Sequence, residues 1–159
     1  MRVGVLGDTH GKIKKAKKAV EQMGDIKLLI HTGDYYEDAL ILSKVSGIKV
    51  KAVTGNCDSY APGPVEELFK IGDFRLYLTH GHLFGVKSSL ARLYQRAEEL
   101  GAHIVIYGHT HMPHQEKKNG ILFLNPGSIT WPRLPGQHSF AVLEYHKSGS
   151  SYTVETCEL

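Results

Sequence analysis

The chain has 159 residues, a formal net charge of +3 at pH 7 and an isoelectric point near 8.8. This length predicts one domain over residues 1–159, and the charge is too mild to indicate nucleic-acid binding by itself. The sequence has no apolar run long enough to cross a bilayer and no signal-peptide pattern, and Cys57 and Cys157 form no paired motif. We therefore expect a soluble cytoplasmic protein with no disulfide framework and no membrane partner.

The first half of the chain alternates β-prone apolar runs with stretches of helical periodicity. Strands are predicted from Val3 onward and at 27–31 and 48–53, and helices at 11–23 and 39–45, where Gly47 is the expected stop. The outer face of the first helix is rich in lysine, which indicates either a solvated surface or an attraction for anions, the first being the simpler expectation. These lysines are Lys12, Lys14, Lys15, Lys17 and Lys18.

The second half contains more hairpin signals. Hairpins are predicted for three pairs of runs: 67–71 with 74–79, 114–118 with 121–124 around an Asn-Gly turn, and 138–145 with 152–156 around Ser148-Gly149-Ser150. Between the first two, a helix at 87–100 and a strand at 103–107 are predicted. Because βαβαβ units precede antiparallel strands, we expect a mixed α/β (α+β) fold with two packed sheets and helices outside.

Five apolar runs end in short polar clusters of Asp, Asn and His. The clusters supply seven candidate side chains: Asp8, His10, Asp34, Asn56, His80, His109 and His111. Because ligands bind beyond the carboxyl ends of strands in open α/β sheets, we expect these side chains to meet in space. Asp-x-His and His-x-His place their ligands at i and i+2, which point to the same side of an extended backbone.

The chemistry of these seven side chains suits divalent metals. Carboxylates, imidazoles and an amide without a cysteine cluster fit manganese, iron, zinc or nickel better than a closed structural zinc site. Seven ligands are too many for one tetrahedral ion but match two ions if Asp34 bridges them. Two ions about 3.5–4 Å apart would share a hydroxide and clamp a phosphoryl group. Each cluster alone also fits turn or capping chemistry, so their joint occurrence carries the interpretation.

The motifs together resemble the calcineurin-like metallophosphoesterase superfamily. They are Asp8-x-His10, Gly33-Asp34-x-x-Glu37-Asp38, Gly55-Asn56-x-Asp58, His80 and Gly108-His109-x-His111. The short length, Asn125-Pro126-Gly127-Ser128 and Pro132-Arg133 are similar to its small bacterial and archaeal phosphodiesterase branch. The resemblance implies a four-layer αββα sandwich of two mixed β-sheets flanked by helices. It also implies one metal on Asp8, His10, Asp34 and His111, and another on Asp34, Asn56, His80 and His109.

Cys57 departs from the superfamily pattern, in which a histidine at this position is thought to protonate the leaving group and the next acidic residue, here Asp58, to orient it. The general acid is therefore unassigned. A thiol with an unperturbed pKa of about 8.5 matches neutral pH less well than an imidazole near about 6.5. We expect activated phosphodiesters to be cleaved better than alkyl phosphomonoesters.

Three further residues have two interpretations each. His82 fits either a place beside the substrate or an ordinary loop histidine. Asp58 fits a group that orients a ligand or a turn residue. Arg133 fits a phosphate contact or a surface salt bridge.

Other polar and aromatic residues have simpler expectations. His31 and His103 lie in apolar runs and are predicted to be core histidines. Asp38 is predicted to be the N-cap of the helix at 39–45 rather than a support of the site. Tyr35 and Trp131 fit the rim of a pocket or a subunit contact.

These features predict a metal-dependent phosphohydrolase, and first of all a phosphodiesterase in which a hydroxide between two divalent ions attacks phosphorus in line. Manganese is the first metal expected, with nickel, iron or zinc as alternatives, and the substrate is a small phosphodiester or phosphate ester. Two other functions stay open, a non-catalytic interaction scaffold like the protein of similar fold in the retromer complex and a nuclease. A homo-oligomer also fits.

Overall fold

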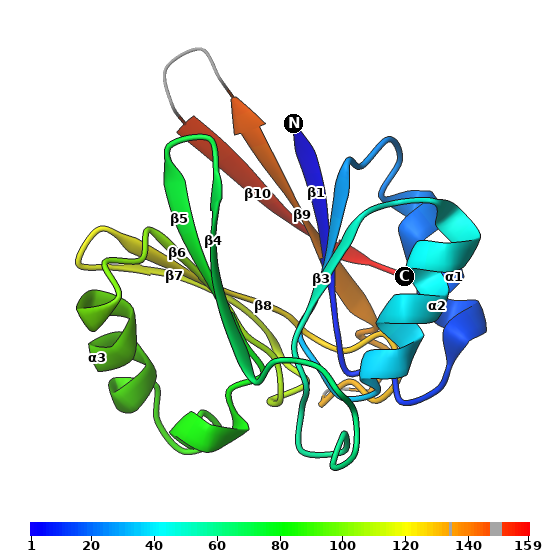
Figure 1. The fold of residues 1–159 in the computed structure, drawn as a ribbon, viewed down its shortest axis with the longest axis horizontal. Helices are drawn as coiled ribbons and strands as arrows, with labels where there is room; N and C mark the ends of the chain where they lie inside the picture. Colours follow the sequence, from blue (N-terminus) through cyan, green and yellow to red (C-terminus); the bar gives the residue numbers. More distant parts are fainter. Residues whose placement is uncertain (134, 147–150) are drawn as a thin grey trace.

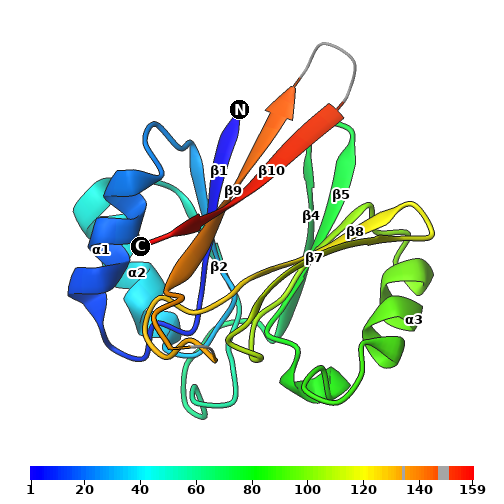
Figure 2. The same ribbon diagram turned by 180° about the vertical axis from the view of Figure 1, so that it is seen from behind.

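The computed structural model describes residues 1–133, 135–146 and 151–159. Two sheets pack face to face, with helices against their outer faces (Figures 1 and 2). The layers follow the order helix, sheet, sheet, helix, so the prediction of an αββα sandwich is confirmed.

The first sheet has the strand order β10-β9-β1-β2-β3. β1 (Arg2–Leu6) pairs in parallel with β2 (Leu28–His31), which pairs in parallel with β3 (Val50–Ala52). On the other side of β1 lies the antiparallel hairpin of β9 (Ser139–His146) and β10 (Ser151–Glu158). The end of the chain thus completes the sheet that its beginning starts. The predicted turn at Ser148-Gly149-Ser150 lies outside the described residues.

The second sheet has the strand order β4-β5-β6-β8-β7. Its strands are β4 (Glu66–Ile71), β5 (Phe74–Thr79), β6 (Ile104–Ile106), β7 (Pro113–Lys118) and β8 (Ile121–Pro126). The two hairpins that the sequence predicts here, β4-β5 and β7-β8, are antiparallel, whereas β6 runs parallel to both β5 and β8. Both sheets are therefore mixed, as expected.

Two helices cover the first sheet and one covers the second. α1 (Ile13–Gln22) and α2 (Tyr36–Ser46) pack on the first sheet, and α2 ends at Gly47, where φ is 70°. α3 (Ala91–Glu99) packs on the second sheet. It begins later than the predicted position 87, because the preceding residues form a 3₁₀ helix, η1 (His82–Phe84), and tight turns that bond back to Gly85.

Three apolar clusters hold the four layers together. The cluster between the sheets includes Val5, Ile30, Leu78, Ile106 and Leu143. The cluster under α1 and α2 includes Ala16, Met23, Leu29, Leu42 and Phe140, and the cluster under α3 includes Leu93, Ala97, Val105 and Phe123. Burial of apolar surface on both faces of each sheet explains why the central strands read as continuous hydrophobic runs.

The prediction that His103 is a core histidine is wrong. His103 is exposed just before β6, where its Nδ1 accepts a hydrogen bond from the backbone N–H of Arg75 at 2.9 Å. The predicted strand includes one residue of the loop that precedes β6, because hydrophobic periodicity cannot show at which residue burial begins.

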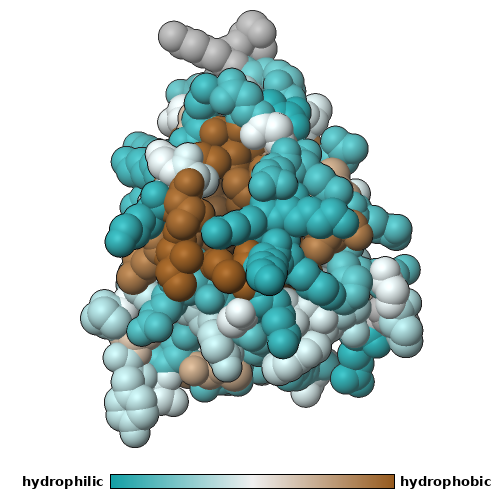
Figure 3. Space-filling view, turned by 90° about the vertical axis from the view of Figure 1, so that its right-hand side faces the viewer, coloured by the Kyte–Doolittle hydropathy of each residue, from teal (hydrophilic) through white to brown (hydrophobic). Residues whose placement is uncertain are grey.

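The outer face of α2 carries apolar side chains. Leu40, Ile41 and Val45 are exposed, and Figure 3 shows an apolar patch among hydrophilic residues on this side of the molecule. Five lysines on and just before α1 are also exposed: Lys12, Lys14, Lys15, Lys17 and Lys18. Within the described residues, no helix combines the length and the apolar character needed to cross a membrane.

Candidate metal centre

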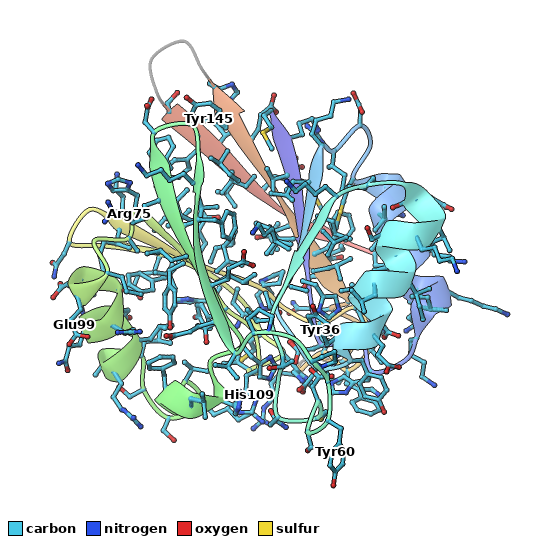
Figure 4. All side chains as sticks on the ribbon, in the orientation of Figure 1. Tyr36, Tyr60, Arg75, Glu99, His109 and Tyr145 are labelled. Carbon is cyan, nitrogen blue, oxygen red and sulfur yellow. The ribbon has the colours of Figure 1, made fainter. Side chains whose placement is uncertain are left out.

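The polar clusters that follow β1, β2, β3, β5 and β6 meet at one edge of the sandwich, the lower edge in Figure 1. In Figure 4, His109 lies at this edge between the two halves of the molecule. The strand ends that are followed by the seven candidates thus lie at one edge, and the distances below show how the side chains group.

Four of the seven side chains form a tight cluster. Asp8, His10, Asp34 and His111 each offer a ligand atom, and these atoms lie within 4.8 Å of one another. His111 Nε2 is 3.1 Å from Asp8 Oδ1, and His10 Nε2 is 3.8 Å from Asp34 Oδ2.

Two polar atoms of this cluster lack hydrogen-bond partners among the described residues. Asp8 Oδ1 and His10 Nε2 are buried and have no hydrogen-bond partner in the described part of the chain. Buried polar atoms are rarely left in this state, and a cation between them would satisfy both. The cluster is a metal-binding site of the Asp/His type.

The remaining three side chains lie on the other side of Asp34. His80 Nε2 is 3.5 Å from Asp34 Oδ1, and it is 3.2 Å from both Asn56 Oδ1 and His109 Nδ1. His80 Nδ1 donates to the main-chain oxygen of Thr32 at 2.8 Å, which leaves the Nε2 lone pair directed toward this group. Asp34 therefore presents one oxygen to His10 and the other to His80.

The backbone at these residues differs from the extended form that the sequence analysis assumed. Five candidates have φ in the left-handed region, namely Asp8 (50°), His10 (45°), Asp34 (54°), His109 (69°) and His111 (57°). The chain therefore turns after β1, β2 and β6 instead of continuing in the extended form. Left-handed backbone costs about 1–2 kcal/mol for a residue with a side chain, and such strain gathers at functional sites.

Burial favours the neutral form of two of the imidazoles, those of His10 and His109. It lowers the pKa of His10, and it lowers the pKa of His109 to about 4, with further contributions from His80 and Lys87. Burial opposes ionisation of Asp34, but His80, the backbone N–H of Cys57 and His10 outweigh it and lower its pKa. His10 and His109 are therefore neutral and Asp34 is charged at neutral pH, which are the forms that bind metals.

A loop after β8 supports the site through hydrogen bonds to the backbone after β1. These hydrogen bonds were not predicted from the sequence. Ser128 Oγ donates to the main-chain oxygen of Asp8 at 3.1 Å, and Thr130 Oγ1 donates to that of Thr9 at 2.9 Å. The available signal was the Asn-Pro-Gly-Ser stretch after an apolar strand.

Two aromatic residues rim the site around His10. The indole of Trp131 stacks on the His10 ring with centroids 4.2 Å apart, and Tyr35 meets the same ring edge-on at 5.6 Å. Both side chains are more than 40% exposed, at 56% and 43% respectively. These contacts agree with the rim interpretation of the two residues.

The residues after Asn56 fix the conformation of the loop that follows β3. Asp58 accepts hydrogen bonds from the backbone N–H groups of Gly55 and Tyr36, both at 2.8 Å, so it fixes the turn and joins it to the start of α2. The backbone N–H of Cys57 donates to Asp34 Oδ1 at 2.9 Å. Burial, together with the nearby charge of Asp34, raises the pKa of the Cys57 thiol to about 11.

The prediction that Asp38 is a helix N-cap is wrong. α2 begins at Tyr36, whose N–H is already satisfied by Asp58, so the cap comes from another loop. Asp38 lies inside the first turn and accepts a hydrogen bond from the backbone N–H of Gly11 at 2.9 Å. It thereby ties the loop after β1 to α2.

Two further histidines lie close to the site. His31 is fully buried, as predicted, and its ring is held by Thr9 Oγ1 at 3.1 Å and by the N–H of Gly33 at 3.2 Å. The His82 ring lies 5.3 Å from that of His80, and its buried Nδ1 has no partner among the described residues. This position favours the interpretation of His82 as a residue beside the substrate.

Comparisons with known proteins agree with this geometry. Residues 1–148 match the family described as the calcineurin-like phosphoesterase superfamily domain. The chain is 36% identical over 145 residues to "Probable metallophosphoesterase YsnB" of Bacillus subtilis, covering 90% of this chain and 83% of that protein. It is 28% identical over 169 residues to "Phosphodiesterase YfcE" of Escherichia coli, covering 91% and 88%.

The structure has a close match as well. A predicted phosphoesterase from Streptococcus pneumoniae superimposes with a TM-score of 0.84 at 30% identity, covering 99% of this chain and 88% of that one. The motifs, the fold and the buried Asp/His cluster point to one family. The chain belongs to the calcineurin-like phosphoesterase superfamily, in its branch of small YfcE/YsnB-type phosphoesterases.

Proposed function

We propose that the protein is a phosphodiesterase that works with two divalent metal ions. The observation that carries the proposal is the placement of Asp34 between two imidazole groups, with Oδ2 at 3.8 Å from His10 Nε2 and Oδ1 at 3.5 Å from His80 Nε2. A carboxylate that faces two sets of ligands is suited to bridge two ions.

The seven side chains divide into two ligand sets around this carboxylate. Asp8, His10, Asp34 and His111 would hold one ion, and Asp34, Asn56, His80 and His109 the other. Bound divalent ions would lower the pKa of a shared water, so that hydroxide forms near neutral pH, and would neutralise charge on the phosphoryl oxygens. Manganese is the metal we would supply first, with nickel, iron and zinc as alternatives.

The chain's own residues prepare this chemistry. Main-chain oxygens of Thr32 and Trp131 accept hydrogen bonds from Nδ1 of His80 and His111 respectively, which orients both rings. In hydrolysis, a bond forms between the hydroxide oxygen and phosphorus while the bond from phosphorus to the leaving oxygen breaks. Because Cys57 stands where an imidazole would donate a proton, the leaving oxygen takes its proton from water, which favours substrates with good leaving groups.

The test is hydrolysis of bis-p-nitrophenyl phosphate beside p-nitrophenyl phosphate. Chelator-stripped protein receives manganese, and Asp34→Asn is compared with Asp25→Asn, which changes an exposed carboxylate paired with Lys27. We expect diesterase activity that Asp34→Asn reduces by about a hundredfold or more and Asp25→Asn leaves intact. Metal analysis of the loaded protein should give two ions per chain, and fewer for Asp34→Asn.

Other outcomes would move the proposal elsewhere. No activity with manganese, nickel, zinc or iron would favour an interaction scaffold, the second function that the sequence left open. Salt-sensitive DNA binding through the exposed lysines around α1 would favour a nuclease. We also propose that residues 1–159 act as one domain, since loops from both sheets contribute ligands.

A further inference from the structure

Two hollows adjoin the metal centre. The first, of about 260 Å³, is bordered by His109, His111 and Trp131 and is called here the site hollow. The second, of about 360 Å³, is called the side hollow and lies against the residues before α3 and after β6. Lys87, Thr110 and Arg133 line both. Since the hollows share these residues, they lie next to each other.

The wall of the side hollow is apolar and partly rigid. Val86, Leu90 and Met112 line it together with the ring of Tyr107. Tyr107 is 2% exposed and its hydroxyl is bonded to His114 Nδ1 at 2.9 Å, so the ring is fixed in place. Met112 is 45% exposed, and its flexible thioether can adapt to a flat ring. The volume falls within the roughly 300–1,000 Å³ of ligand pockets.

The residues shared by the two hollows add positive charge. Lys87 and Arg133 are exposed, and no ion pair found in the described residues includes either of them. The backbone N–H of Arg133 bonds to the main-chain oxygen of His111 at 3.0 Å, and Arg133 lines the site hollow together with His109 and His111. Two divalent ions on the ligands above already supply charge for one phosphodiester group, so these cations suit a second anion.

We propose that the side hollow receives an aromatic group that carries its own phosphate, so that the substrates are diesters or anhydrides of nucleotide type. The ring packs on the apolar wall, its own phosphate pairs with Lys87 and Arg133, and the scissile phosphate lies at the metals. The proposal rests on the proposed phosphodiesterase function, whose substrate class it narrows. It assigns a specificity role to Lys87, Arg133 and Met112.

Binding to the metal-free protein tests this without relying on turnover. The ligands are adenosine 5′-monophosphate, adenosine and inorganic phosphate, followed by calorimetry and by the fluorescence of Trp131, the single tryptophan. The nucleotide should bind at least about tenfold more tightly than either fragment, because it makes both contacts. Lys87→Met and Arg133→Gln should each weaken nucleotide binding about fivefold or more, and Met112→Gln should weaken the nucleotide but not phosphate.

Matched controls lie on α2, where Lys44→Met and Leu40→Gln change exposed residues away from both hollows and should leave binding unchanged. Equal binding of nucleotide and phosphate, or equal losses in the control variants, would overturn the proposal. In the manganese-loaded enzyme the nucleotide should compete with bis-p-nitrophenyl phosphate. An active enzyme that binds no nucleotide defeats this inference alone, whereas nucleotide binding without any esterase activity defeats the proposed function.

Discussion

His111 donates a hydrogen bond from Nδ1 to the main-chain oxygen of Trp131 at 2.7 Å, and this bond directs its Nε2 toward Asp8 Oδ1, 3.1 Å away. The adjacent carboxylate of Asp8 raises the pKa of His111, although burial opposes it. In this position His111 has a left-handed backbone, with φ at 57°, which is strained for a residue with a side chain. A member of the Asp/His cluster is thus held by a loop contact more than by local preference.

The strain at His111 gives a first prediction. In the metal-free protein, His111→Gly should be more stable than His111→Ala by about 1 kcal/mol, because only glycine adopts this φ without strain. The measurement is urea unfolding in the presence of a chelator. Lys44 lies inside α2, where the same pair of substitutions should give the opposite order, with alanine the more stable. Equal stabilities at position 111 would show that the left-handed backbone is not retained in solution.

Gly55 gives a second prediction, because the Asp34 side chain fills the space that a side chain at this position would need. A Cβ at this position would overlap Asp34 Oδ1 and approach the Asp34 backbone nitrogen to 2.6 Å. Gly55→Ala should therefore displace Asp34 and lower manganese-dependent diesterase activity by about a hundredfold. Gly24→Ala meets no atom within 4 Å and should keep full activity despite its backbone strain. Full activity of Gly55→Ala would mean that Asp34 does not act from this position.

Cys57 gives a third prediction, about the leaving group. We propose that a proton donor is missing at this position. Cys57→His supplies an imidazole there, and it should raise kcat/KM on alkyl phosphate esters by about ten- to a hundredfold while changing p-nitrophenyl esters little. The readout is the slope of log kcat/KM against the leaving-group pKa, which should become shallower. Cys157→His, at the other free cysteine, is the matched control. An unchanged slope contradicts the proposed lack of a general acid.

A fourth prediction concerns acid stability and His31. Burial lowers its pKa to about 4, although Asp8, Asp38 and Asp58 act in the opposite direction. Between about pH 6.5 and pH 4 the unfolded chain takes up a proton at His31 that the folded chain does not. The stability is therefore complete above this range and falls as the pH decreases through it, by roughly 3 kcal/mol in total.

The check is urea unfolding of the chelated protein at pH 7 and pH 5. His31→Asn keeps an acceptor for the N–H of Gly33 and cannot be protonated in this range. It should be less stable than the parent at pH 7 but lose less stability on going to pH 5. An identical pH dependence in both proteins would mean that His31 does not titrate as its burial requires.

The sequence by itself determined the elements, the layers and the ligand residue types, because hydrophobic periodicity and strand-end polar clusters are local signals. The two strand-helix units at the start and the strand that follows them, the Asn119-Gly120 hairpin and the seven candidate ligands could all be read from the chain. The observed ends of helices and strands differ from the predicted ones where a residue from another segment makes a contact. α2 begins at Tyr36 because Asp58 satisfies its first N–H, and no local signal contains that contact.

Only the tertiary structure decided how these pieces meet. It joined β9 to β1 across the length of the chain, and it placed Trp131 against His10 and Arg133 beside His111. It also gave five of the seven candidate ligands a left-handed backbone where extended strands were expected. Such contacts depend on the packing of sheets and loops that are distant in sequence. The free energy that maintains them comes from burial of the whole core rather than from the residues that make the contacts.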